Sequence, residues 1–168
     1  MASSPIVLAI LVMGMGAGAF IDLRTRRVPN VLTMTLATIG ISFAAGGISG
    51  LTVIASVLGL ALGLGLMLPG YLFGATGAGD VKLLAAAGAL LGPAHIVLAF
   101  VYTALAGGVL ALVVARQRRR LAITLEGTGQ LIATGAANAA AIEHPAANNR
   151  FAYAPAIAVG SVLAAFGL

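Results

Sequence analysis

Long apolar runs, each ending in a charged or glycine- and proline-rich turn, dominate this sequence. Most runs approach the roughly 20 residues that a helix needs to cross a bilayer. Hydrophobic residues make up 61% of the chain and charged residues 8%, with a mean hydropathy of +1.11. A soluble domain carries about 25% charged residues, and a soluble core of this size could not bury so many apolar side chains. The sequence therefore predicts an all-α integral membrane protein.

Turn signals divide the chain into a predicted bundle of six transmembrane helices. Pro29 suits the first position of the second helix, Pro69 and Gly70 should end the third, and Gly92-Pro93 should close the fourth. Residues 71–79 are expected to form a loop or a re-entrant segment. The predicted spans are 5–21, 29–46, 51–68, 80–91, 94–115 and 151–168.

Glycines four residues apart predict where helices pack closely. Gly14 and Gly18 have this spacing in the first span, and Gly59 and Gly63 have it in the third.

The positive charges predict the orientation. No basic segment precedes the first span and three arginines follow it, which favours a retained helix with its N-terminus outside. With six spans, all nine lysines and arginines then fall on the inner side, as the positive-inside rule requires. Both termini are expected outside. The polar residues 116–150 are expected to form a cytoplasmic loop, in which Leu121, Leu125, Leu131 and Ile132 suggest an interfacial amphipathic helix.

Several function classes are disfavoured by composition. The chain has no cysteine, which excludes disulfides and cysteine-bound zinc. His95 and His144 are far apart and lack the spacing of metal ligands, so no metal or organic cofactor is expected. The arginine clusters at 24–27 and 116–120 flank apolar spans, which favours contact with membrane lipid over nucleic acid.

Asp22 and Asp80 are the two aspartates of the chain, and each lies at the cytoplasmic end of a predicted helix. Ionisable groups beside membrane spans are costly and commonly functional. Two close carboxyl groups cannot easily both ionise, so one can act as base and the other as acid. Structural alternatives remain open: Asp22 could pair with Arg24 or Arg26, and Asp80 could cap its helix.

The residues around Asp80 and after Asp22 are candidates for shaping a site. Gly77 and Gly79 tolerate positive φ and leave room for a substrate backbone to approach, or else form a simple turn. Lys82 lies about 200° around a helix from Asp80, so it should be a snorkelling anchor or a substrate contact and not a partner of Asp80. Asn30, after Pro29, is expected to cap the second helix locally.

Three motifs resemble those of the prepilin peptidase (type IV leader peptidase) family of GxGD membrane aspartyl proteases. Residues 22–30 read DLRTRRVPN, residues 77–84 read GAGDVKLL, and residues 151–158 read FAYAPAIA, with Phe151 where proline is more usual. The resemblance covers residues 1–115 and 150–168. It implies Asp22 and Asp80 as catalytic residues of one transmembrane peptidase domain, 1–168.

The resemblance also implies a function. An aspartic endopeptidase of this kind removes the short basic leader of prepilins or pseudopilins at the cytoplasmic face of the bacterial inner membrane, for pilus assembly and protein secretion. Larger members carry a methyltransferase portion with a four-cysteine zinc site, which this chain lacks, so it is similar to the short form associated with Flp (tight-adherence) pili. Alternatives are a preflagellin-type signal peptidase, a proton-coupled transporter, or an assembly factor of a secretion system without catalytic activity.

Overall fold

The computed structural model describes residues 4–117 and 153–167, and every regular element within these ranges is an α-helix. The predicted all-α class is thus confirmed for these residues. The helices, in chain order, are α1 (Pro5–Thr25), α2 (Asn30–Ala45), α3 (Val53–Leu72), α4 (Ala78–Gln117) and α6 (Ala154–Phe166). The predicted cytoplasmic loop, 116–150, falls almost wholly outside the described residues.

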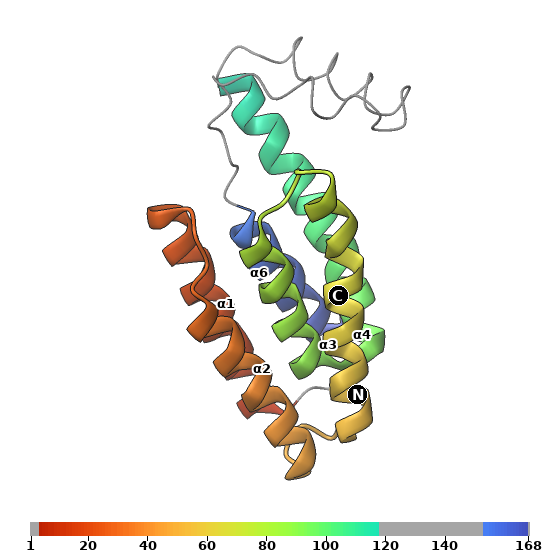
Figure 1. The fold of residues 1–168 in the computed structure, drawn as a ribbon. Helices are drawn as coiled ribbons and strands as arrows, with labels where there is room; N and C mark the ends of the chain where they lie inside the picture. Colours follow the sequence, from red (N-terminus) through yellow and green to blue (C-terminus); the bar gives the residue numbers. More distant parts are fainter. Residues whose placement is uncertain (1–3, 118–152, 168) are drawn as a thin grey trace.

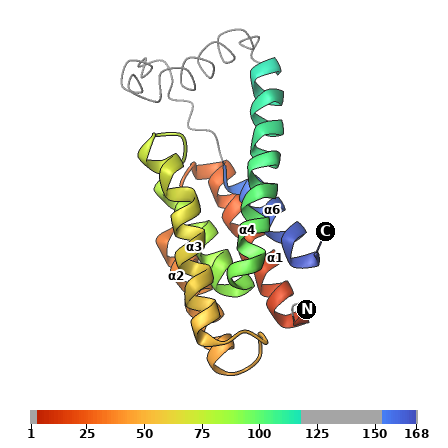
Figure 2. The ribbon, with the colours of Figure 1, turned by 90° about the vertical axis from the view of Figure 1, so that its right-hand side faces the viewer.

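Helix α4 is two arms joined at a reversal. Gly92 lies inside the helix with φ 75° and ψ 177°, a conformation that a residue with a side chain rarely adopts. Pro93 follows and cannot continue the hydrogen-bond ladder of the first arm. Figure 2 shows the chain turning back at this point, so that the arms 78–91 and 93–117 run in opposite directions. The predicted break at Gly92-Pro93 is confirmed.

The helical segments alternate in direction along the bundle (Figure 1). The first arm of α4 lies against α3, where Gly59 and Gly88 bring the two backbones together and a Cβ on either would overlap the carbonyl oxygen of the other. Ser56 Oγ also donates to the Ala89 carbonyl across this interface, at 2.7 Å. Small residues permit such close approach between membrane helices. The predicted packing role of Gly59 is therefore confirmed.

Helix α6 lies against the second arm of α4, and α1 lies against α6. Gly160 packs against Thr103 and the Ala99 carbonyl of α4, so α6 also uses a glycine for close contact. In α1, Gly14 meets Leu36 of α2, and Gly18 meets Leu83 of α4. These contacts confirm the packing role predicted for the glycines of the first helix.

Three of the described helices are long and apolar enough to cross a membrane: α1, α3 and α4. The α2 and α6 helices are apolar but shorter. Large apolar side chains cover the outer surface, including Met13, Val31 and Ile54, as expected for a face that contacts lipid. The chain is a helical membrane protein, while the count of six spans and the positions of the termini stay predictions.

Several predicted helix ends were wrong by up to four residues, about one turn. Helix α3 continues through Pro69 to Leu72 and is capped at Phe73, whose N–H donates to the Pro69 carbonyl. A proline this close to a helix end removes one hydrogen bond without displacing a long segment. Pro29 is the N-cap of α2 and not its first helical residue, and α1 continues to Thr25.

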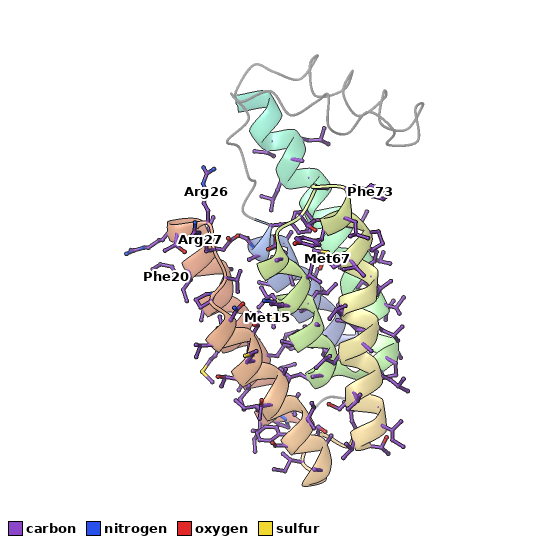
Figure 3. All side chains as sticks on the ribbon, in the orientation of Figure 1. Met15, Phe20, Arg26, Arg27, Met67 and Phe73 are labelled. Carbon is purple, nitrogen blue, oxygen red and sulfur yellow. The ribbon has the colours of Figure 1, made fainter. Side chains whose placement is uncertain are left out.

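The helix ends place distant parts of the sequence together. Arg26 and Arg27, after α1, and Phe73, after α3, lie toward the same end of the bundle (Figure 3). The starts of α2, α4 and α6 lie at this end too (Figure 1). We call this the aspartate end, since it holds Asp22 and Asp80.

Candidate active site

Asp22 lies in the last turn of α1 and points into the bundle, with 5% of its surface exposed. Its Oδ2 accepts a hydrogen bond from the backbone N–H of Ala154, at 3.3 Å. That N–H is one of the unpaired donors at the start of α6, where the helix dipole also favours a negative charge. The positive charge of Arg26 acts on the same carboxyl group.

Asp80 lies in the first turn of α4 and is 7% exposed. Its Oδ2 accepts a hydrogen bond from the backbone N–H of Gly77, at 3.0 Å. This is the reach-back contact of a capping box, made by the third helical residue to the residue before the helix. Asp80 therefore does cap its helix, from the third position and not from the N-cap.

The two aspartates come together at the aspartate end, although 58 positions of sequence separate residue 22 from residue 80. Their carboxyl groups lie close enough for their charges to interact. Both backbone hydrogen bonds use Oδ2, and no described residue donates to Oδ1 of either group. The alternative partner Arg24 instead lies over the Phe20 ring, 4.6 Å from its centre. Within residues 4–117 and 153–167, the arrangement is a buried carboxyl pair in which one oxygen of each group is held by a backbone N–H.

The glycines before Asp80 do not have the positive φ that the sequence suggested, so that expectation was wrong. The positive-φ glycines of this region are Gly74 and Gly92. Gly77 and Gly79 are needed for space. A Cβ on Gly77 would lie 3.2 Å from Asp80 Oδ2, and one on Gly79 would lie 3.0 Å from Val28 Cβ. The space beside Gly79 is thus filled by the loop that follows Asp22.

Lys82 and Asn30 are bonded to each other. The Lys82 ammonium group donates to Asn30 Oδ1 at 2.9 Å, joining α4 to the start of α2. The prediction that Asn30 caps α2 locally was wrong, because its side-chain oxygen is used by Lys82 and the N-cap residue, Pro29, makes no side-chain cap. Together with the contact between Gly79 and Val28, this bond ties the segment after Asp22 to the segment around Asp80.

Two groups at the site were not assigned from the sequence. The backbone N–H of Ala154 binds Asp22, and the Tyr153 side chain packs on Gly107 of α4. Both residues belong to the FAYAPAIA motif, which indicated a helix but not which atoms of it reach the aspartates. The pair Gly107-Gly108, in a span of larger apolar residues, was the available signal that something packs closely there.

Among residues 4–117 and 153–167, no group of three or more histidines or acidic residues could hold a metal ion. The described groups at the aspartate end are a carboxyl pair with backbone donors, a tyrosine and a lysine–asparagine bond. Such a pair can activate a water and protonate a leaving group.

Comparison with known proteins agrees with the motifs. The model of the type IV leader peptidase family matches residues 9–112. This match extends from α1 into the second arm of α4 and includes both aspartates. Searches of curated proteins and of solved structures find no match. Because the family model covers more than half of the chain, the chain belongs to the type IV leader peptidase family, a family of peptidases.

Proposed function

We propose that this protein is an aspartic endopeptidase that removes the short basic leader of a prepilin or pseudopilin, with Asp22 and Asp80 as its catalytic residues. The observation that carries the proposal is the buried carboxyl pair, whose groups lie within range of each other's charge. Family membership supports a leader peptidase. It counts against the alternative of a proton-coupled transporter.

The carboxyl pair is suited to peptide hydrolysis. One group, ionised, takes a proton from a water whose oxygen attacks the peptide carbonyl carbon. The other, protonated, gives its proton to the carbonyl oxygen. When the tetrahedral intermediate breaks down, the C–N bond breaks and the leaving nitrogen takes up a proton. The backbone donors at Ala154 and Gly77 hold one oxygen of each carboxyl group in place, which limits the reorganisation needed during reaction.

The position of the pair at one end of the bundle suits a substrate with a basic leader followed by an apolar helix. An apolar helix of the substrate would lie in the bilayer beside the apolar outer surface, and its basic leader would extend past the aspartate end. Arg24 is directed at Phe20 and Lys82 at Asn30.

The short connection between α1 and α2 supports the form without methyltransferase activity. Thr25 ends α1 and Asn30 begins α2, which leaves no room there for a separate module. The chain also has no cysteine for a four-cysteine zinc site. We therefore favour a prepilin of the Flp type as substrate, with preflagellin-type substrates as the comparison.

The function is tested with the full chain purified in detergent and mixed with an Flp-type prepilin. We expect a single cut at the boundary between the basic leader and the apolar helix, identified by mass spectrometry of both products, with an unchanged rate in EDTA. A preflagellin offered in parallel measures substrate preference. Absence of any cut by the wild-type protein, with the prepilin intact and soluble, would overturn the proposal.

The orientation can be tested with introduced cysteines, because the natural chain has none. Ala75→Cys and Ile48→Cys place one thiol in an exposed loop at each end of the bundle. In intact inner-membrane vesicles of known sidedness, we expect an impermeant maleimide to label position 75 from the cytoplasmic side and position 48 from the other. Labelling of both from one side, or in the reversed order, would contradict a cytoplasmic active site.

A further inference from the structure

Tyr153 is held at the aspartate end by two helices. It is the N-cap residue of α6 and directly precedes Ala154, whose N–H binds Asp22. Its half-buried side chain lies on Gly107 of α4, where a Cβ would be 2.5 Å from the tyrosine hydroxyl oxygen and 2.6 Å from Cε2. The missing side chain at Gly107 is therefore what makes room for the phenol, and the ring has a defined place.

The hydroxyl of Tyr153 interacts with the charge of Asp80 and keeps its proton. Burial raises the pKa of Tyr153, and the negative charge of Asp80 raises it further. The hydroxyl is therefore neutral at neutral pH and lies within range of the Asp80 charge. No hydrogen bond from it to another described residue is present. A buried or half-buried tyrosine hydroxyl normally finds a partner. Within residues 4–117 and 153–167 this hydroxyl donates to none, so it can donate to a bound substrate.

We propose that the Tyr153 hydroxyl is a third catalytic group, which donates a hydrogen bond to the carbonyl oxygen of the peptide bond held between Asp22 and Asp80. The proposal rests on the proposed function. As water attacks, the carbonyl oxygen gains electron density and accepts a proton from the acidic aspartate. The phenol holds that oxygen in place without losing its own proton. A donor fixed before the reaction stabilises such a developing charge without having to reorganise.

Replacement of Tyr153 by phenylalanine tests this directly, because the ring and its packing on Gly107 are kept and the hydroxyl alone is lost. We expect Tyr153→Phe to lower kcat for prepilin cleavage about 100-fold, as for loss of one donor to an oxyanion. KM and the melting temperature should change little. Tyr71→Phe is the matched control, since it removes the same group from a residue that is 45% exposed at the end of α3, and it should cleave like the wild type.

Three results would overturn the proposal. If Tyr153→Phe keeps wild-type kcat while Tyr153→Ala loses activity, the residue acts through packing alone. If Tyr153→Phe raises KM with kcat unchanged, the hydroxyl contributes uniform binding and not transition-state stabilisation. If the acidic or basic limb of the pH profile of kcat/KM moves, the hydroxyl instead affects the protonation of Asp80 in the free enzyme.

The failure of this inference is separable from failure of the proposed function. The wild-type protein is assayed beside the variants on the same prepilin. If the wild type cleaves and Tyr153→Phe is equally active, the proposed role of the hydroxyl is wrong and the proposed peptidase function stands. A wild type that does not cleave removes the function itself.

Discussion

Asp22→Asn and Asp80→Asn are each expected to lower the rate of leader removal by about 1,000-fold or more. Each variant loses one of the two carboxyl groups, and with it either the base that activates water or the acid that donates a proton. Asparagine has nearly the shape of aspartate and keeps an oxygen that can accept from the N–H of Ala154 or Gly77. Both variants should therefore insert and fold. Initial rates on the prepilin, with far-ultraviolet circular dichroism of the purified variants, check the two parts of this expectation.

The other acids of the chain provide the control. Glu126→Gln and Glu143→Gln make the same chemical change at the two remaining acidic positions, and they should leave cleavage within a few-fold of the wild type. Cleavage at a wild-type rate by either aspartate variant removes that residue from the mechanism. A large loss in the glutamate variants would show that the assay reports on total charge.

Gly79→Val is expected to lower cleavage about 100-fold, the effect of a misplacement of about 1 Å at a reacting group. The first atom of the new side chain would lie 3.0 Å from Val28 Cβ and 3.3 Å from Val28 N, so the loop after Asp22 must move away from the turn before Asp80. Thermal stability should change little, because a four-residue connection can shift while the helix contacts stay. Steady-state rates and melting curves of the same preparation measure both effects.

A second substitution distinguishes this cause from a blocked substrate path. Gly79→Ala introduces the same first atom, and Val28→Gly removes the Cβ and Cγ2 atoms that it would crowd. Gly79→Ala should therefore be impaired, and the double variant Gly79→Ala with Val28→Gly should recover most of the lost rate. If Gly79 instead leaves room for the substrate, Val28→Gly will restore nothing.

Much of the fold could be predicted because the lengths of the apolar runs and the positions of the turn residues are local features of the sequence. Gly92-Pro93 marked a reversal, and the reversal is there. Pro69 carried a similar signal but lies in the last turn of a helix, since position relative to the helix end decides whether a proline interrupts it. Local signals fixed the elements more reliably than their ends.

The site was predictable in its residues more than in their contacts. Asp22 and Asp80 stood out because acids are rare in this chain. The bond between Lys82 and Asn30 did not, because it joins segments 52 positions apart and depends on how α2 and α4 lie together. The role of Gly79 was misread for the same reason. A glycine can serve its own backbone or a neighbour's side chain, and only the packed structure distinguishes the two.

The unequal lengths of the helices around the site have a consequence for the bilayer. Helix α6 has 13 residues, a length of about 20 Å against a hydrocarbon core of about 30 Å. The second arm of α4 continues for about 15 Å past Gly107, the level at which Tyr153 and the start of α6 lie. A short helix beside a long one creates hydrophobic mismatch, which a bilayer relieves by thinning locally. Local thinning beside α6 would bring interfacial water closer to the carboxyl pair, without a pore through the protein.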